Sequence, residues 1–165
     1  MKNRKIVSIL IVLALAFSVL TACAPDPIQT DLKSYINDQI PAIQALRDQA
    51  STAYNEVAAD NYQDDATMLA ALTDTVIPAA NGALEAAQKL APETKEVADV
   101  NDQLIAALTS YVSGYTTLAE ALTNGDAAKV DEAQTFLASA QTEDADFFTA
   151  LTTLATDHGL KINTK

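Results

Sequence analysis

Apolar residues recur every three or four positions along most of the chain, which is the period of an α-helix. No stretch alternates apolar and polar residues between turn signals, as a half-buried β-strand would. The helical pattern falls into four segments, which short polar or glycine-containing stretches separate. We expect these segments at about residues 30–59, 65–90, 92–124 and 127–158.

Residues that favour helix ends mark the boundaries of these segments. Pro92 suits the first turn of the third helix, because its missing N–H costs nothing there. Gly125 and Gly159 are expected to end the third and fourth helices. The expected N-caps carry a side-chain oxygen that accepts hydrogen bonds from the first turn. They are Thr30 or Asp31, Asp64 or Asp65, and Asp126.

The third segment carries the clearest apolar stripe, with a spacing typical of helices packed about 20° from antiparallel. Long helices with connections of a few residues favour antiparallel neighbours. The predicted fold is therefore all-α, an up-down-up-down antiparallel four-helix bundle about 40 to 45 Å long. The stripe consists of Val97, Val100, Leu104, Leu108, Tyr111, Tyr115, Leu118 and Leu122.

Two prolines lie inside the first and second segments, each in an Ile-Pro-Ala context. Pro41 and Pro78 should each kink a helix and free a backbone carbonyl. Counted from the turn near Tyr62, the two kinks lie at similar heights, so they could bow the bundle open there. The alternative is that they only curve two long helices, or that Pro41 starts the main part of the first helix.

The first 23 residues have the pattern of an export signal. Basic residues between Met1 and Lys5 precede an apolar run from Ile6 to Leu20, which is too short for a membrane span of about 20 residues. The run ends in Leu20-Thr21-Ala22-Cys23, which resembles the lipobox of bacterial lipoproteins. The resemblance implies cleavage between Ala22 and Cys23 and attachment of a diacylglyceryl group to the Cys23 thiol.

This resemblance sets the expected domains and location. Residues 1–22 are the predicted signal peptide, 23–29 the lipidated cysteine with a short tether, and 30–165 the bundle. The protein is expected to be anchored by lipid and to face outside the cytoplasm, on the plasma membrane or the outer membrane. Ala24 follows the cysteine where, by the same resemblance, an aspartate would favour retention at the inner membrane.

Charge excludes one class of partner. From residue 23 onward the chain keeps 7 of its 10 basic residues and all 22 acidic residues, a net charge of −15. Phosphate contacts need clustered Lys and Arg, so no nucleic-acid binding is expected. The same excess of acid disfavours contact between the protein surface and anionic lipid, which leaves the Cys23 lipid as the membrane attachment.

Motifs for catalysis, metals and cofactors are missing from the sequence. It has one histidine and one cysteine, so neither a zinc cluster nor a Glu-x-x-His di-iron pattern can form. It has no Gly-x-Ser-x-Gly elbow and no phosphate-binding glycine loop. We expect no catalytic residue, no metal site and no cofactor, and hence a protein that is not an enzyme.

Two features leave alternatives open. Tyr35, Tyr54, Tyr111 and Tyr115 lie at helical spacing, which fits either core and boundary positions or a ligand groove between bowed helices. Asp144 falls on the apolar stripe of the fourth helix, where an unpaired carboxylate would be costly. Either the helix turns there so that Asp144 faces water, or the carboxylate forms a polar notch that accepts a cation.

The features together favour a non-enzymatic envelope lipoprotein that acts as a binding or scaffolding module. A helix face or a kink-opened groove would then receive an envelope protein or an amphipathic segment. The alternative is a bundle that binds a small ligand or a cation, as an accessory to transport or sensing. Beyond residue 23 the likeness to lipoproteins is architectural, and architecture says little about activity.

Overall fold

The computed structural model describes residues 25–162, and every regular element in that range is a helix. The all-α class is therefore confirmed. Ala22, Cys23 and the predicted signal peptide lie outside the described residues. The elements are α2 (Pro27–Ser34), η2 (Tyr35–Gln39), α3 (Ile40–Asn55), η3 (Ala59–Asn61), α4 (Asp65–Ala71), η4 (Leu72–Val76), α5 (Ile77–Gln88), α6 (Lys95–Asn124) and α7 (Ala127–Asp157).

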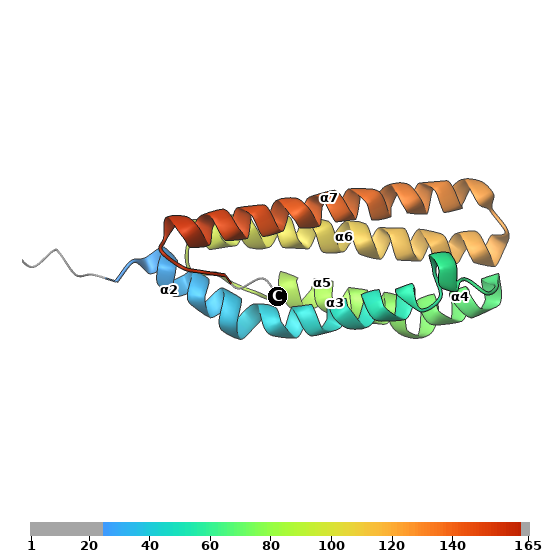
Figure 1. Cartoon of the computed structure of the whole chain (residues 1–165), viewed down its shortest axis with the longest axis horizontal. Coiled ribbons are helices and arrows are strands. Elements are labelled where there is room, and N and C mark those ends of the chain that lie inside the picture. Colours follow the sequence, from blue (N-terminus) through green and yellow to red (C-terminus); the bar gives the residue numbers. More distant parts are fainter. Residues whose placement is uncertain (1–24, 163–165) are drawn as a thin grey trace, which may run out of the picture.

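These elements form long rods that lie side by side (Figure 1). The first rod is the unbroken helical run α2–η2–α3, and the second is α4–η4–α5. Helices α6 and α7 form one layer, and the first two rods form the other (Figure 1). Helix α6 packs against both α7 and α5, and α3 packs against α5. Asn81 and Gly82 do not interrupt α5, which continues to Gln88.

The first helix begins earlier than the sequence predicted. Asp26 is the N-cap, and its carboxylate accepts hydrogen bonds from the backbone N–H groups of Ile28 and Gln29. Pro27 takes the first helical position, where its fixed φ and missing N–H fit. The expectation of Thr30 or Asp31 as N-cap is therefore wrong, and three residues of the predicted tether 23–29 belong to the helix.

The other helix ends are set by a mixture of local and distant groups. Asp64 and Asp126 cap α4 and α7 as expected, and Gly125 ends α6 in the left-handed conformation with φ of 64°. The expected role of Pro92 is wrong, because α6 begins at Lys95 with Thr94 as its N-cap. The acceptor for Thr94 comes from the first rod, as the carboxylate of Asp31.

Each internal proline follows a widened, π-helical turn. In η2 the N–H of Ile40 donates to the carbonyl of Tyr35, five residues back, and in η4 the N–H of Ile77 donates to Leu72 in the same way. A wider turn lets the backbone pass a proline ring that would clash with the carbonyl four residues back. The rods therefore stay continuous, and the first one bends at η2 (Figure 1).

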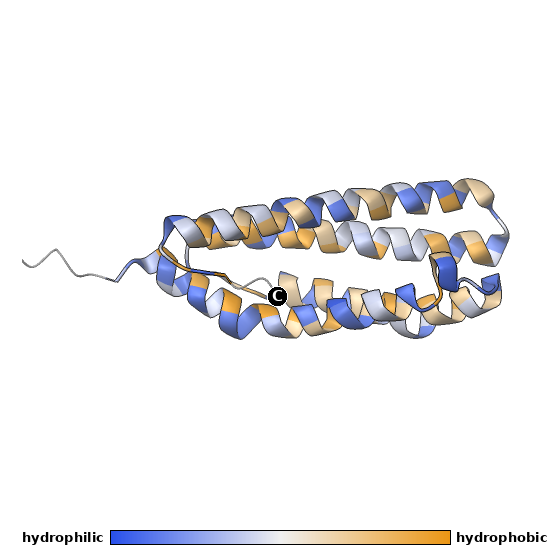
Figure 2. Ribbon diagram, viewed as in Figure 1, coloured by the Kyte–Doolittle hydropathy of each residue, from blue (hydrophilic) through white to orange (hydrophobic). Residues whose placement is uncertain are grey.

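The core is divided into two clusters along the length of the molecule. Apolar residues recur along every rod (Figure 2), and their buried members form two clusters. The Tyr35 cluster contains Leu32, Tyr35, Ile43, Ala83, Ala87, Val97, Val100, Leu104, Leu108, Phe147, Leu151 and Ala155. The Tyr115 cluster contains Ala50, Ala58, Met68, Leu72, Val76, Ala79, Ala80, Tyr115, Leu118, Ala119 and Ala133.

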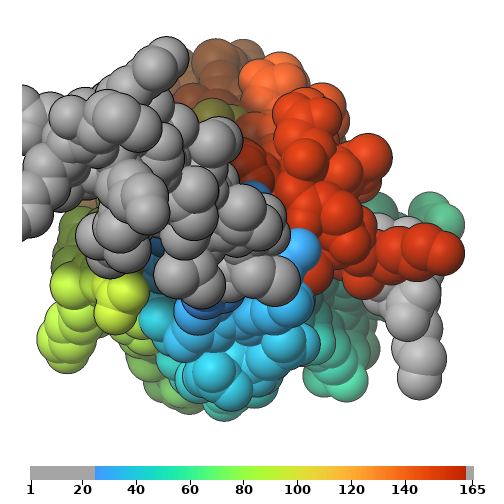
Figure 3. Space-filling view, turned by 90° about the vertical axis from the view of Figure 1, so that its left-hand side faces the viewer, coloured from blue at the N-terminus to red at the C-terminus, as the bar shows by residue number. Residues whose placement is uncertain are grey.

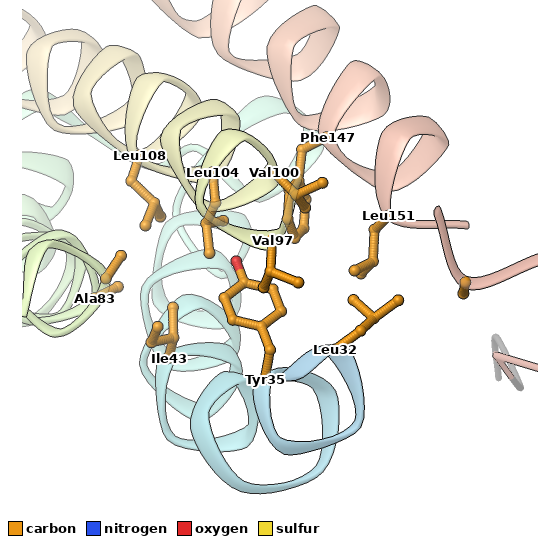
Figure 4. Packing of buried hydrophobic residues seen from close by; sticks show 12 residues of the cluster. Leu32, Tyr35, Ile43, Ala83, Val97, Val100, Leu104, Leu108, Phe147 and Leu151 are labelled. Carbon is orange, nitrogen blue, oxygen red and sulfur yellow. The ribbon is translucent and has the colours of Figure 1, made fainter. Parts of the chain in front are cut away.

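A buried polar chain fixes the Tyr35 cluster. The ring of Tyr35 points into the cluster toward Val97 and Leu104 (Figure 4). Its hydroxyl donates to Oδ1 of Asn101 at 3.1 Å, and Nδ2 of Asn101 donates to the carbonyl of Ala87 at 3.1 Å. The hydroxyl of Tyr35, the side-chain amide of Asn101 and the carbonyl of Ala87 all have a hydrogen-bond partner, so burying them carries no large desolvation cost.

Candidate functional site

A cavity of about 210 Å³ lies between the two core clusters. Ala83 and Leu108 from the Tyr35 cluster and Ala50, Ala80 and Tyr115 from the Tyr115 cluster all line it. The lining on the first two rods starts within one turn after Pro41 and Pro78, at Gln44 and Ala80. The cavity thus occupies the place where the apolar packing is interrupted.

Small side chains create the space in this cavity. Three of the apolar lining residues are alanines: Ala50 on α3, and Ala80 and Ala83 on α5. All three are buried, so each holds a core position with one carbon where larger apolar residues usually fill the interior. The apolar part of the lining on α3 and α5 therefore consists of short side chains.

Tyrosines from α6 form one wall. The rings of Tyr111 and Tyr115 are stacked with centroids 6.0 Å apart, and Tyr54 packs behind Tyr115 at 5.2 Å. Burial raises the pKa of Tyr115 well above its ordinary value of 10.0 and also raises the pKa of Tyr111, so both hydroxyls are neutral at pH 7. Among the described residues, neither hydroxyl has a hydrogen-bond partner.

An ion pair lies at the polar side of the cavity. Nη2 of Arg47 on α3 is 2.5 Å from Oδ1 of Asp144 on α7, and both side chains are mostly buried. Nη1 of Arg47 also donates to Oε1 of Gln44, and its guanidinium lies 5.7 Å from the ring centre of Phe148. These three neighbours hold the guanidinium in one position.

Acid outnumbers base in the cavity wall. Asp48 is exposed beside Gln44, whose Nε2 donates to Oδ1 of Asp48 at 2.7 Å. The charged lining residues are Arg47, Asp48 and Asp144, with a sum of one negative charge at neutral pH. A polar, acidic rim therefore stands over a small apolar floor.

The four tyrosines named from the sequence do not share one groove. Tyr111 and Tyr115 line the cavity, and Tyr54 touches it only through Tyr115. Tyr35 is fully buried in the Tyr35 cluster, bonded to Asn101, and does not belong to the cavity. The extra residue in η2 turns Tyr35 onto the same face as Ile43, which places its ring in the core.

Asp144 faces inward and pairs with Arg47, so the alternative in which it faces water is wrong. The cation that its carboxylate accepts in the structure is the guanidinium of Arg47. Arg47 lines this candidate site and was not predicted from the sequence. The signal was there, because a carboxylate on an apolar stripe requires a cation nearby, and Arg47 is the only arginine after residue 23.

Residues 25–162 lack two further features. No group of three His, Cys, Asp or Glu side chains lies close enough together to hold a metal ion. No helix in this range combines the length and apolar character that a membrane crossing needs. Comparisons with protein-family models, curated proteins and solved structures found no match.

Proposed function

We propose that this protein is a lipid-anchored envelope protein whose helical domain binds a small molecule and catalyses no reaction. The domain is an up-down-up-down antiparallel four-helix bundle, and the cavity between its core clusters is the binding site. The lipobox-like residues Leu20 to Cys23 support the anchor, which places the bundle on the outer side of a membrane.

The observation that carries this function is the composition of the cavity wall. A ligand site is usually a small apolar hollow with a few polar groups that fix orientation. Here alanines and Leu108 provide the hollow, while two tyrosine hydroxyls and the Arg47–Asp144 pair provide the polar groups. An apolar cavity of about 150 Å³ holds benzene, so about 210 Å³ suits one ring with a short substituent.

The scaffold for a partner protein, which the sequence alone favoured, has weaker support. A contiguous exposed apolar patch of a few hundred Å² would mark a docking face. In the described part of the chain, Tyr62 and Phe148 are the large apolar residues that stand exposed. They come from different rods, α4 with its preceding loop and α7, and two single side chains do not make such a patch.

The binding function is tested with the full chain in phosphatidylcholine nanodiscs. A panel of one-ring compounds is screened by equilibrium dialysis, with empty nanodiscs subtracted. We expect at least one compound to bind the wild type and to lose binding in Ala80→Leu, which fills the cavity. Ala45→Leu, on an exposed position of α3, is the matched control and should bind normally. Equal binding by wild type and Ala80→Leu would refute the site.

The anchor is tested separately in bacterial cells. Cells are fed a fatty acid carrying an alkyne tag, and the protein is captured and probed for the tag. We expect labelled wild-type protein in the membrane fraction. Cys23→Ser should be unlabelled, because it lacks the thiol that would carry the lipid. Label on the Cys23→Ser variant would contradict the anchor.

A further inference from the structure

We propose that the cavity selects an organic cation, an ammonium group carried on an apolar body about the size of one aromatic ring. This inference rests on the proposed small-molecule binding and names the chemical class of the ligand. Three independent properties of the wall point to it: the balance of charge, the two tyrosines and the apolar residues of the floor.

The charge balance favours a cation. Arg47 is the single base in the wall, and its charge is already opposed by Asp144 at 2.5 Å. The carboxylate of Asp48 faces no basic side chain in the lining, and Oδ2 of Asp144 is not used by Arg47. An incoming ammonium group would meet one uncompensated negative charge and free carboxylate oxygens.

An anion would meet the opposite situation. It would have to separate Arg47 from Asp144, and this would leave a mostly buried carboxylate without its partner. The chain after residue 23 also carries a net charge of −15, which repels anions approaching from solution. Arg47 is therefore a wall residue that fixes Asp144, and it does not serve as an anion receptor.

The tyrosines supply recognition suited to a cation. Aromatic faces carry negative potential, and an ammonium group within about 6 Å of a ring centre is attracted to it. The stacked rings of Tyr111 and Tyr115 stand in the wall next to Asp144, on the neighbouring helix. Their neutral hydroxyls also carry oxygen lone pairs that no described residue uses, and an ammonium N–H can donate to them.

The floor requires that the cation carry an apolar group. Ala50, Ala80, Ala83 and Leu108 offer no polar side chain, so a bare metal ion would gain nothing there. A ring that fills this floor removes apolar surface from water, which favours binding. The ligand would therefore bind with its ring against the apolar floor and its ammonium group at the acidic rim.

Three soluble compounds with the same ring test this class: benzylammonium, benzyl alcohol and benzoate. Each is dialysed to equilibrium against the full chain in phosphatidylcholine nanodiscs, with empty nanodiscs subtracted. We expect benzylammonium to bind at least tenfold more tightly than benzyl alcohol. Benzoate should bind more weakly than benzyl alcohol.

Wall variants show whether the charge and the rings are responsible. Tyr111→Leu should weaken benzylammonium several-fold while leaving benzyl alcohol within about twofold. Asp48→Asn should weaken benzylammonium to a similar degree, and because Asp48 is exposed this variant should keep its fold. Tyr62→Leu and Asp38→Asn remove the same side chains at exposed positions outside the lining, and should change nothing.

Each other outcome is decisive. Equal binding of benzyl alcohol and benzylammonium, abolished by Ala80→Leu, would overturn the cation class and leave the binding site standing. Preference for benzoate would overturn the class and make Arg47 the recognition group. If none of the three binds and the wider panel also gives no compound sensitive to Ala80→Leu, the proposed function itself fails.

Discussion

The carboxylate of Asp31 accepts two hydrogen bonds from Thr94, one from its backbone N–H at 2.8 Å and one from its hydroxyl at 2.7 Å. A residue inside the first helix thus accepts the hydrogen bonds of the N-cap residue of α6, Thr94, whose side chain does not cap the helix itself. The bond spans 63 residues of sequence and joins two rods at the end where the chain enters the domain.

We therefore expect Asp31→Ala to lower the free energy of unfolding by about 1 to 3 kcal/mol, because two donors lose their buried acceptor. Urea denaturation followed by circular dichroism measures this. Asp38→Ala removes an exposed acid from the same rod and should change stability by less than about 0.5 kcal/mol. Equal effects of the two variants would contradict the capping role.

Two helical glycines should respond oppositely to the same substitution. A Cβ at Gly82 would lie 3.5 Å from a methyl of Leu46, an ordinary contact, so Gly82→Ala should stabilise by about 0.5 to 1 kcal/mol. A Cβ at Gly114 would lie 2.7 Å from Cγ of Leu137 on α7. Gly114→Ala should therefore destabilise by about 1 kcal/mol despite its better helix propensity.

Thermal melts of the two glycine variants and the wild type in the same buffer decide this prediction. The double variant Gly114→Ala with Leu137→Ala loses the two closest contacts and keeps the one to the carbonyl oxygen of Ala133 at 3.3 Å. Gly114→Ala should therefore cost less in the Leu137→Ala background than in the wild type. A stabilised Gly114→Ala protein would show that α6 and α7 can separate without loss.

The Arg47–Asp144 pair should behave as a partly buried ion pair. Arg47→Met alone leaves Asp144 without its cation and should destabilise by about 1 to 3 kcal/mol. Adding Asp144→Leu should recover most of that loss, because two apolar side chains fill the same space without a charge. Chemical denaturation of both variants provides the test, and a double variant less stable than Arg47→Met would count against it.

Alkaline conditions should unfold the domain through its buried tyrosines. Burial raises the pKa of Tyr35 and Tyr115 above the ordinary 10.0, so the folded state keeps protons that the unfolded chain releases. Stability is then constant below about pH 10 and falls as the pH rises from there toward the folded-state pKa. Tyrosinate absorbance should appear together with the loss of helical circular dichroism.

Tyr35→Phe is the variant that separates this effect from general alkaline damage. It should be less stable near neutral pH, because Oδ1 of Asn101 loses its donor. Above about pH 10 its stability should fall less steeply than that of the wild type, because one buried ionisable group is gone. Parallel curves for the two proteins would rule out Tyr35 as a cause.

Acid should weaken the end of the domain where Asp26 lies. The hydrogen bond with His158 is the main cause that lowers the pKa of Asp26 below its ordinary 3.8. A lowered pKa gives stability that is present above about pH 4 and is lost as the pH falls through the folded-state value. Asp26→Asn should therefore show a shallower loss of stability below about pH 4, measured by urea denaturation across the acid range.

Local chemistry explains which parts of the fold the sequence predicted well. Asp64, Gly125 and Asp126 act on their own helix ends, within a few residues of the chain, so their roles were predictable. Asp31 has the same residue type as those caps but turns to Thr94, far along the sequence. Asp26 followed by Pro27 was the local signature of the true start, and it was missed because these residues were assigned to the tether.

The candidate site was predictable only in part, for a similar reason. Helical spacing put Tyr111 and Tyr115 on one face, and both line the cavity. Tyr35 was grouped with them because its rotation about the helix depends on η2, whose extra residue has no signature beyond the nearby Pro41. The hollow itself arises from alanines on two separate rods, so it requires knowledge of how the rods pack.

The contacts of His158 give the domain a definite response to mechanical load. Its ring bonds Asp26 at 2.5 Å and its carbonyl accepts from Gln29, which holds the entry of the first rod against the exit of the last (Figure 3). A pull applied at Pro25 therefore acts on both terminal helices together. The contacts of His158 with Asp26 and Gln29 must then break before the first helix can unfold from its N-terminus. Without these contacts the first helix would unfold one turn at a time.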